Sequence, residues 1–152
     1  MCLTVNTRIH KKNGYKYIPF IAETDLMVYK CIDHNSNTGE YYTPFQYCTI
    51  KFKNGMCKMQ SSLEYTKNIS FGIHGLYSEK TANRMSTCFT DSNTTKHWAI
   101  IPKGSEFFIG VDADIVSNNL LVFKTREDYR KYRKEHNVKI LHTFLKKNYN
   151  VV

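Results

Sequence analysis

The chain divides into two stretches whose compositions favour different secondary structures. Residues 1–124 alternate short runs of aromatic and β-branched side chains with turn-forming residues, which is typical of strands. Residues 125–149, TREDYRKYRKEHNVKILHTFLKKNY, contain neither glycine nor proline and place apolar residues at helical spacing. We therefore expect an α+β fold, a twisted and mostly antiparallel sheet followed by C-terminal helices.

Eight short runs rich in Ile, Val, Phe or Tyr are the predicted strands. They cover residues 17–22, 26–33, 47–53, 56–60, 68–72, 98–102, 106–110 and 120–124. The best local signal is Asn54-Gly55 between two of them, because a type I′ hairpin turn needs positive φ at both central residues. We expect a hairpin there, and an exposed loop over the polar residues 86–96.

Helix signals occur at three places. Ser78 precedes good helix formers and predicts the cap of a short helix. Thr125 and Asp128 have capping-box spacing for a basic helix, which Asn137 is expected to end. A second C-terminal helix is predicted to dock on the sheet through an apolar stripe formed by Leu141, Phe144 and Leu145.

The length of 152 residues suits one core and is short for two. We expect a single domain over residues 1–152, with a sheet-rich core over 1–124 and basic helices over 125–148. The sequence shows no signal-peptide core and no run near the ~20 apolar residues of a membrane span. These features predict a cytoplasmic protein that does not associate with membranes.

The charge balance points to an anionic partner. The chain has 22 basic and 13 acidic residues, a net charge of +9, which favours attraction to a nucleotide, nucleic acid or acidic protein. The five cysteines include no C-x-x-C pair, and the six histidines show no metal-ligand spacing. We expect reduced cysteines, no bound metal and no cofactor.

A histidine between two glycines, Gly72-Ile-His74-Gly75, is the densest chemical signal. Glycines permit close approach of a ligand, and a helix beginning at Ser78 would offer free N–H groups to an anion. His74, Tyr77 and Ser78 are therefore candidate ligand contacts. The alternative is that the glycines serve a bend between strand and helix, and that His74 bonds a buried carbonyl.

Two further segments supply candidate cations. Pro102-Lys-Gly104-Ser105 suits a type II turn that presents Lys103 and Ser105. Tyr29 and Lys30 alternate along a predicted strand. We expect the turn and the His74 segment to face one cavity, although an ordinary hairpin and a solvated strand-end lysine are the alternatives.

The first C-terminal helix is basic with tyrosines between its charges. Its cations are candidates for nucleic-acid or other surface contacts, with Tyr129 and Tyr132 able to stack on bases. The alternative is an ordinary solvated helix supported by pairs at i, i+4 spacing. The candidate contact residues are Arg126, Arg130, Lys131, Arg133 and Lys134.

Five short motifs carry a family resemblance. In order they are Met1-Cys-Leu, the segment through Val28-Tyr-Lys30, Gly72-Ile-His-Gly75, Ile101-Pro-Lys-Gly-Ser105 and Ile115-Val-Ser-Asn118. Over about residues 1–123 the chain resembles a family of small, uncharacterised proteins encoded by tailed phages and prophages. That family usually has G-F-H-[ST] where this chain has Gly75, so no hydroxyl role is assigned there. The resemblance implies a phage accessory protein made in a bacterial cytoplasm, without implying an activity.

Three function classes follow from these features. We expect a protein that binds an anionic, nucleotide-type ligand, sequestering a host-defence signal without catalysis. The second class is a nucleotide- or NAD-processing enzyme, because the order of motifs distantly resembles ADP-ribosyltransferase-like folds. The glutamate that those enzymes need before the last strand has no clear match here, and Glu106 is a weak candidate for it. The third is a surface-acting inhibitor of a host protein or a nucleic-acid-binding protein, and a homo-oligomer stays open. No phosphate loop, dinucleotide fingerprint, nucleophile elbow or zincin motif is present.

Overall fold

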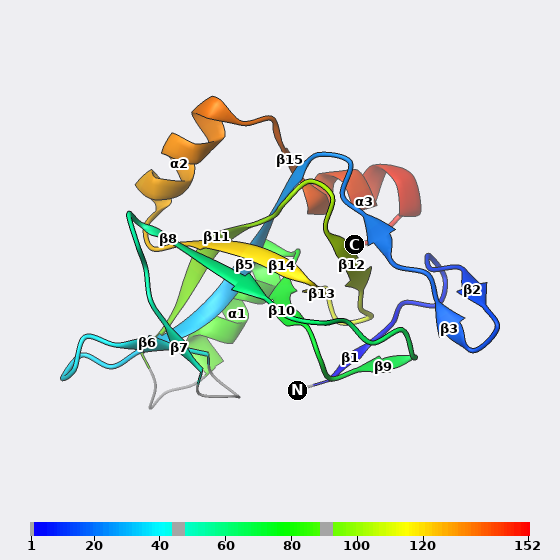
Figure 1. Ribbon diagram of the computed structural model, residues 1–152, viewed down its shortest axis with the longest axis horizontal. Helices are drawn as coiled ribbons and strands as arrows, with labels where there is room; N and C mark the ends of the chain where they lie inside the picture. Colours follow the sequence, from blue (N-terminus) through cyan, green and yellow to red (C-terminus); the bar gives the residue numbers. More distant parts are fainter. Residues whose placement is uncertain (1, 44–47, 89–92) are drawn as a thin grey trace.

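The computed structural model describes residues 2–43, 48–88 and 93–152, which form an α+β fold (Figure 1). Its helices are α1 (Glu79–Cys88), α2 (Arg126–Glu135) and α3 (Leu141–Tyr149). Its strands are β1 (Leu3–Thr4), β2 (Lys12–Asn13), β3 (Lys16–Tyr17), β4 (Phe20–Ile21), β5 (Asp25–His34), β6 (Tyr41–Tyr42), β7 (Thr49–Ile50), β8 (Met56–Gln60), β9 (Asn68–Ile69), β10 (Ile73–Leu76), β11 (Thr94–Ile101), β12 (Glu106–Ile109), β13 (Asp114–Ser117), β14 (Asn119–Phe123) and β15 (Val138–Ile140). No helix of these described ranges is long and apolar enough to cross a membrane.

The main sheet is mostly antiparallel and is organised around β5. Its strands run in the order β4-β12-β13-β10-β5-β11-β14-β8. The sheet curls, so that β8 passes in front of β5 and approaches β10 in the view of Figure 1. Because of this curl, residues of β10 and of β8, which are four strands apart in the sheet, line the same cavity.

The two edges of β5 are paired differently. One edge pairs with β11 along eight consecutive positions, from Leu26 to Asp33. The other edge is shared by β15, by β10 at Tyr29 alone and by β6 from Asp33 onward. Residues 30–32 therefore face no strand at that edge among the residues described. An opening in the sheet results, between β10 and β6.

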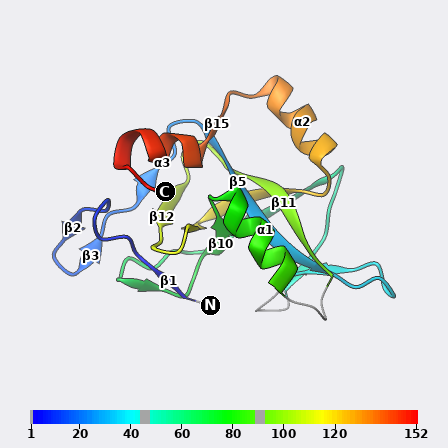
Figure 2. The ribbon, with the colours of Figure 1, turned by 180° about the vertical axis from the view of Figure 1, so that it is seen from behind.

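The sheet separates two apolar layers. Its inner face, which carries Val28, Ala99 and Val122, packs inside the curl and against α3. Its outer face, which carries Met27 and Ile100, is covered by α1 and α2. Figure 2 shows these two helices in front of β5 and β11, with part of the sheet uncovered between them. A third cluster packs the N-terminal strands against β12 and β13.

All three predicted helices are confirmed. Ser78 Oγ accepts a hydrogen bond of 3.3 Å from the backbone N–H of Thr81 at the start of α1. Thr125 and Asp128 form the capping box of α2. Leu141 and Leu145 of α3 are fully buried, but Phe144 is 42% exposed and lies outside the predicted docking stripe. The local capping signals are correct because they depend only on neighbouring residues.

Other sequence-based boundaries are wrong where long-range pairing decides the structure. The predicted loop over residues 86–96 is helical up to Cys88 and is strand β11 from Thr94, while its residues 89–92 lie outside the described part of the chain. Residues 138–140, predicted to begin a helix, form strand β15 parallel to β5. The predicted strand 17–22 is split by Pro19 into separate strands. Polar or helix-compatible residues adopt strand structure here because β5 provides a partner.

The Asn54-Gly55 turn is confirmed, but the long hairpin around it is not. The two residues have φ of 54° and 77°, and Lys53 pairs with Met56 across the turn. Beyond that bridge, β7 pairs with β6 and β8 pairs with β14. Part of the predicted strand 47–53 lies outside the described residues.

Replacing Tyr132 with phenylalanine is expected to lower the free energy of unfolding by about 1–2 kcal/mol. The Tyr132 hydroxyl donates a 2.6 Å hydrogen bond to Asp25 Oδ2, and a bond to a charged acceptor contributes roughly this much. Tyr129→Phe is the matched control, because the buried Tyr129 hydroxyl has no well-formed hydrogen bond among the described residues. Urea unfolding should show almost no loss for Tyr129→Phe. Equal losses in both variants would contradict this account of α2 docking.

Candidate functional site

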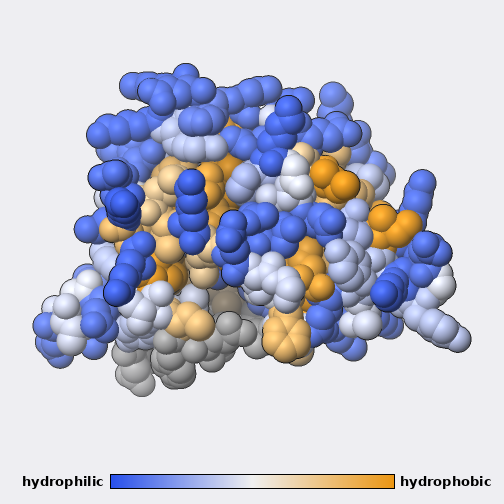
Figure 3. All heavy atoms as spheres, in the orientation of Figure 1, coloured by the Kyte–Doolittle hydropathy of each residue, from blue (hydrophilic) through white to orange (hydrophobic). Residues whose placement is uncertain are grey.

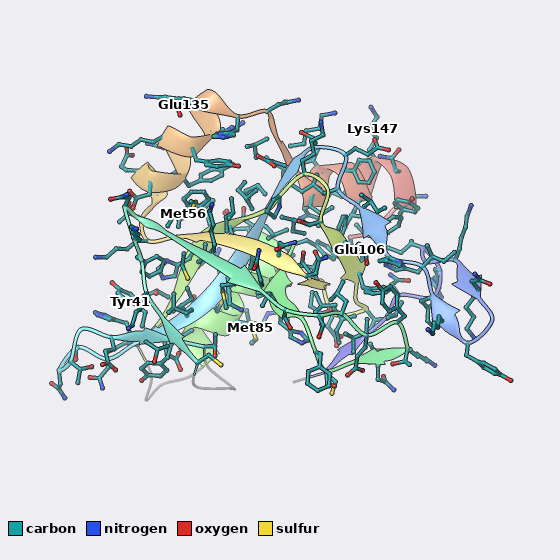
Figure 4. The ribbon with its side chains drawn as sticks, viewed as in Figure 1. Tyr41, Met56, Met85, Glu106, Glu135 and Lys147 are labelled. Atoms are coloured by element: carbon teal, nitrogen blue, oxygen red, sulfur yellow. The ribbon has the colours of Figure 1, made fainter. Side chains whose placement is uncertain are left out.

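The opening at the edge of β5 leads into a cavity of about 430 Å³. On this side of the molecule, hydrophobic side chains are exposed over β8 and β14 between hydrophilic ones (Figure 3). Met85 lines the cavity from α1, behind the sheet in Figure 4. The lining residues that matter below are Lys30, Cys31, Ile50, Cys57, Met59, His74, Leu76 and Met85. Inner-face and outer-face side chains both contribute, so the cavity passes through the opening.

Lys30 is the cation of this cavity. It lies on the inner-face register of β5, opposite His97 of β11, and only 7% of its surface is exposed. Its Nζ donates a 2.6 Å hydrogen bond to the backbone carbonyl of His74, across the opening. No carboxylate of a described residue lies within ion-pair distance of it. Burial lowers the pKa of Lys30 to about 8, with only neighbouring thiols opposing the shift.

His74 belongs to β10 and lies beside Lys30 of β5. It is inside its strand and not at the strand end. Both ring nitrogens are shielded from solvent and lack a well-formed hydrogen bond among the described residues. Burial, followed by the charge of Lys30, lowers the pKa of His74 to about 4, with the backbone of Ser70 opposing the shift. The imidazole is therefore neutral at pH 7 and offers one donor and one acceptor.

Gly75 allows β10 to approach β5. A Cβ at this position would lie 2.9 Å from the backbone oxygen of Tyr29. The close approach that the sequence predicts at this glycine is therefore made by a strand. The same contact places His74 and its carbonyl next to Lys30.

Two cysteines line the cavity as neutral thiols. Burial raises the pKa of Cys31 to about 11, and Cys31 Sγ donates to the backbone oxygen of Ala82 at 3.5 Å. Burial also raises the pKa of Cys57. Both groups stay protonated at neutral pH, which leaves them poorly nucleophilic.

Lys103 and Ser105 do not share this cavity, so the expectation of one common cavity is wrong. They line a second pocket of about 530 Å³, and β8 contributes to the walls of both. The Lys103 backbone N–H donates to Asp25 Oδ1 at 2.8 Å, and its side chain is exposed. Ser105 is buried, with 4% of its surface exposed, and is not presented at the tip of the turn. The turn is held by Asp25, away from β10.

Three other predicted contacts lie outside the cavity lining. Tyr29 is on the outer face, where its hydroxyl donates to Glu79 Oε2 at 2.8 Å. Tyr77 is buried in the inner-face core. Ser78 caps α1. Period-two alternation explains the separation of Tyr29 from Lys30, because adjacent strand residues face opposite sides.

The five predicted basic contacts, Arg126, Arg130, Lys131, Arg133 and Lys134, are all exposed on α2. The tyrosines between them are engaged elsewhere. Tyr129 is 5% exposed, and Tyr132 bonds Asp25 while stacking on His136 at 3.8 Å. Neither ring is open to a base.

Glu106, the candidate for a transferase-type glutamate, lies on β12, apart from Met85 and the cavity (Figure 4). Its Oε2 accepts a 2.5 Å hydrogen bond from the Tyr65 hydroxyl. Within the described ranges, no group of three His, Cys, Asp or Glu side chains is placed to hold a metal.

Sequence reasoning missed most of the cavity wall. Met59 and Cys57 come from β8, and Met85 comes from α1, none of which carries a motif. The alternation of Cys57 and Met59 along β8 indicates that they are partly buried, without indicating a cavity. Comparisons of the chain with protein-family models, curated proteins and solved structures find no match.

Proposed function

We propose that the cavity at the edge of β5 binds a small anionic ligand of the nucleotide class, with Lys30 as its charge partner. The observation that carries this proposal is a buried ammonium with one hydrogen bond and no carboxylate partner among the described residues. A buried charge is costly unless it is paired, so an incoming anion would offset that cost.

The shape and chemistry of the cavity favour a ligand with one anionic group and a flat, apolar body. Ile50, Met59, Leu76 and Met85 give apolar walls, which suit a nucleobase. The neutral His74 ring supplies a donor and an acceptor for the polar edge of such a base. One buried cation balances one phosphate better than a chain of phosphates.

Protonation states favour binding without turnover. The thiols of Cys31 and Cys57 are held neutral by burial, and Lys30 is hydrogen-bonded to a carbonyl. Covalent catalysis needs an activated nucleophile with a base in contact with it, and these groups do not form such a pair.

We propose, from the sequence resemblance, that this ligand is a nucleotide signal of bacterial host defence. Sequestration by a phage-encoded protein in the host cytoplasm would then lower its free concentration. The positive net charge supports capture of an anion through long-range attraction.

Calorimetry with nucleoside monophosphates, cyclic dinucleotides, ADP-ribose and NAD tests the proposal. We expect a nucleotide to bind at least tenfold more tightly than its matched uncharged nucleoside. Lys30→Met or His74→Ala should weaken that binding by about 10- to 100-fold, because a charge-assisted hydrogen bond contributes roughly 1.5–3 kcal/mol. Lys103→Ala, at the second pocket, is the control and should change affinity less than twofold.

Chromatography of the released ligand separates the three function classes. Intact ligand at one equivalent supports sequestration. Product formed in excess over protein would overturn it in favour of an enzyme. Absence of binding across the panel would overturn it in favour of a surface-acting inhibitor.

A further inference from the structure

Trp98 of β11 lies on the outer face of the sheet, where it packs against the cluster that includes Met27 and Ile100. It is half-buried and sits opposite Tyr29 in the antiparallel ladder, with ring centroids 6.3 Å apart in an edge-on arrangement. The Tyr29 hydroxyl donates a 2.8 Å hydrogen bond to Glu79 Oε2, which fixes the Tyr29 ring. The indole is therefore fixed at its edge and partly open to solvent.

Two cations lie against the indole. Lys96 Nζ is 5.0 Å and Arg126 Cζ is 5.5 Å from the ring centroid of Trp98. The nearest acidic partner, Glu79, is 3.7 Å from Lys96 Nζ and is itself about half exposed. The contact of the exposed Arg126 contributes about 0.5–1 kcal/mol, whereas the Lys96 side chain is only 18% exposed and its contact contributes up to about 2 kcal/mol. Arg126 is therefore the more easily redirected of the two cations.

The row of positive charge continues along α2. Residues three, four and seven apart share one helix face, which groups Arg126, Arg130 and Arg133 over about 10 Å. The contact of Arg126 with Trp98 shows that this face borders the indole. The charge of Arg133 is felt by the Tyr129 hydroxyl, where it opposes the rise in the pKa of Tyr129 caused by burial.

We infer that this surface binds single-stranded nucleic acid, with a base stacked on Trp98 and phosphates bound by Lys96, Arg126 and Arg130. Base stacking on an aromatic ring contributes about 1–3 kcal/mol, more than the exposed Arg126 contact and comparable with the Lys96 contact. The displaced cations then neutralise the adjoining phosphates. A duplex offers no free base to a recessed indole, whereas a single strand does.

This inference differs from the sequence-based one, which assigned stacking to Tyr129 and Tyr132. It also concerns residues other than those of the nucleotide cavity, because none of Lys96, Trp98 and Arg126 lines that cavity. Loss of one activity would leave the other in place.

The protein itself carries the probe, since Trp98 is its only tryptophan. Titration with oligothymidylate at low salt is expected to quench its fluorescence to saturation. The slope of log affinity against log salt should be about −2, from roughly 0.7 for each of three phosphate contacts. Duplex DNA of equal length should bind at least tenfold more weakly.

Anisotropy of a labelled oligothymidylate tests the residues. Trp98→Leu should weaken binding about tenfold, and Trp98→Phe should restore most of it. Arg126→Gln should reduce the salt slope by about 0.7, whereas Lys131→Gln, on the solvent side of α2, should leave affinity within twofold. Binding without quenching, or equal binding of the Trp98→Leu variant, would overturn the proposal. Equal quenching by polyglutamate or by phosphatidylserine vesicles would also overturn it, in favour of an acidic protein or a membrane surface.

Discussion

The free energy of unfolding of the wild-type protein is expected to rise by about 3 kcal/mol between pH 7 and pH 10.5, relative to that of a Lys30→Met variant. Burial lowers the pKa of Lys30 from 10.5 to about 8. Between these two values the unfolded chain binds one more proton than the folded chain, so stability increases with pH. A shift of this size corresponds to about 3 kcal/mol.

Methionine is unbranched and uncharged and is one heavy atom shorter than lysine, so it removes the ammonium and keeps most of the apolar stem. Urea unfolding under reducing conditions at half-unit pH steps gives the two curves, and titrating groups that do not interact with Lys30 cancel in their difference. Cys31 and His74 do not cancel fully, because the charge of Lys30 lowers the pKa of each. Lys58→Met is the matched control, because Lys58 lies on β8 at the same cavity but is exposed. Its curve should run parallel to that of the wild type. A parallel curve for Lys30→Met would mean that the ammonium is not buried as described.

Replacing Gly72 with alanine is expected to cost about 2–6 kcal/mol of stability. Gly72 has φ of +128°, and a Cβ there would lie 2.3 Å from Val116 Cγ2 and 2.7 Å from Leu63 Cδ2. Backbone strain and overpacking each cost roughly 1–3 kcal/mol. Gly72 begins the segment that carries His74, so this strain falls on the wall of the cavity.

Gly14→Ala separates the two contributions. Gly14 also has positive φ, +66°, but a Cβ there meets no atom within 4 Å. We expect a loss of about 1 kcal/mol for this variant, from strain alone. Chemical denaturation of both variants at one pH checks the difference. Equal losses would show that Val116 and Leu63 yield to the added methyl group.

Apolar runs and capping residues in the sequence correctly predict several strands and helices. The apolar run 26–33 indicates β5, and the Thr125–Asp128 spacing indicates the start of α2. The cap of α2 is formed by its own neighbouring residues, whereas β5 is indicated by its apolar run although its pairing partners are distant in the sequence. The α+β class follows from the same signals.

The candidate site depends on strand pairing, which local patterns do not contain. The strand pattern around Lys30 is the same whether its side chain is solvated or buried. Its burial depends on β10, whose His74 carbonyl accepts its hydrogen bond, and on the curl that brings β8 to the same cavity. The flanking glycines single out His74 as a candidate ligand contact. In the structure, Gly75 instead allows β10 to lie close to β5. Lys103 was assigned to the same cavity because a turn with a cation resembles a binding loop, but Asp25 holds that turn elsewhere. Trp98 carries no motif, and only its position between two helices distinguishes it.

The pH dependence of nucleotide affinity tests the central claim most directly. An anion paired with Lys30 raises the pKa of Lys30, so binding takes up a proton once the free ammonium titrates. For the tightest-binding nucleotide of the calorimetric panel, affinity should be constant from pH 7 to about 8 and should then fall about tenfold per pH unit. Lys30→Met should bind weakly at every pH, with no such decline. A wild-type affinity that stays flat to pH 10, or the same decline in Lys30→Met, would contradict the assignment of Lys30 as the charge partner of the ligand.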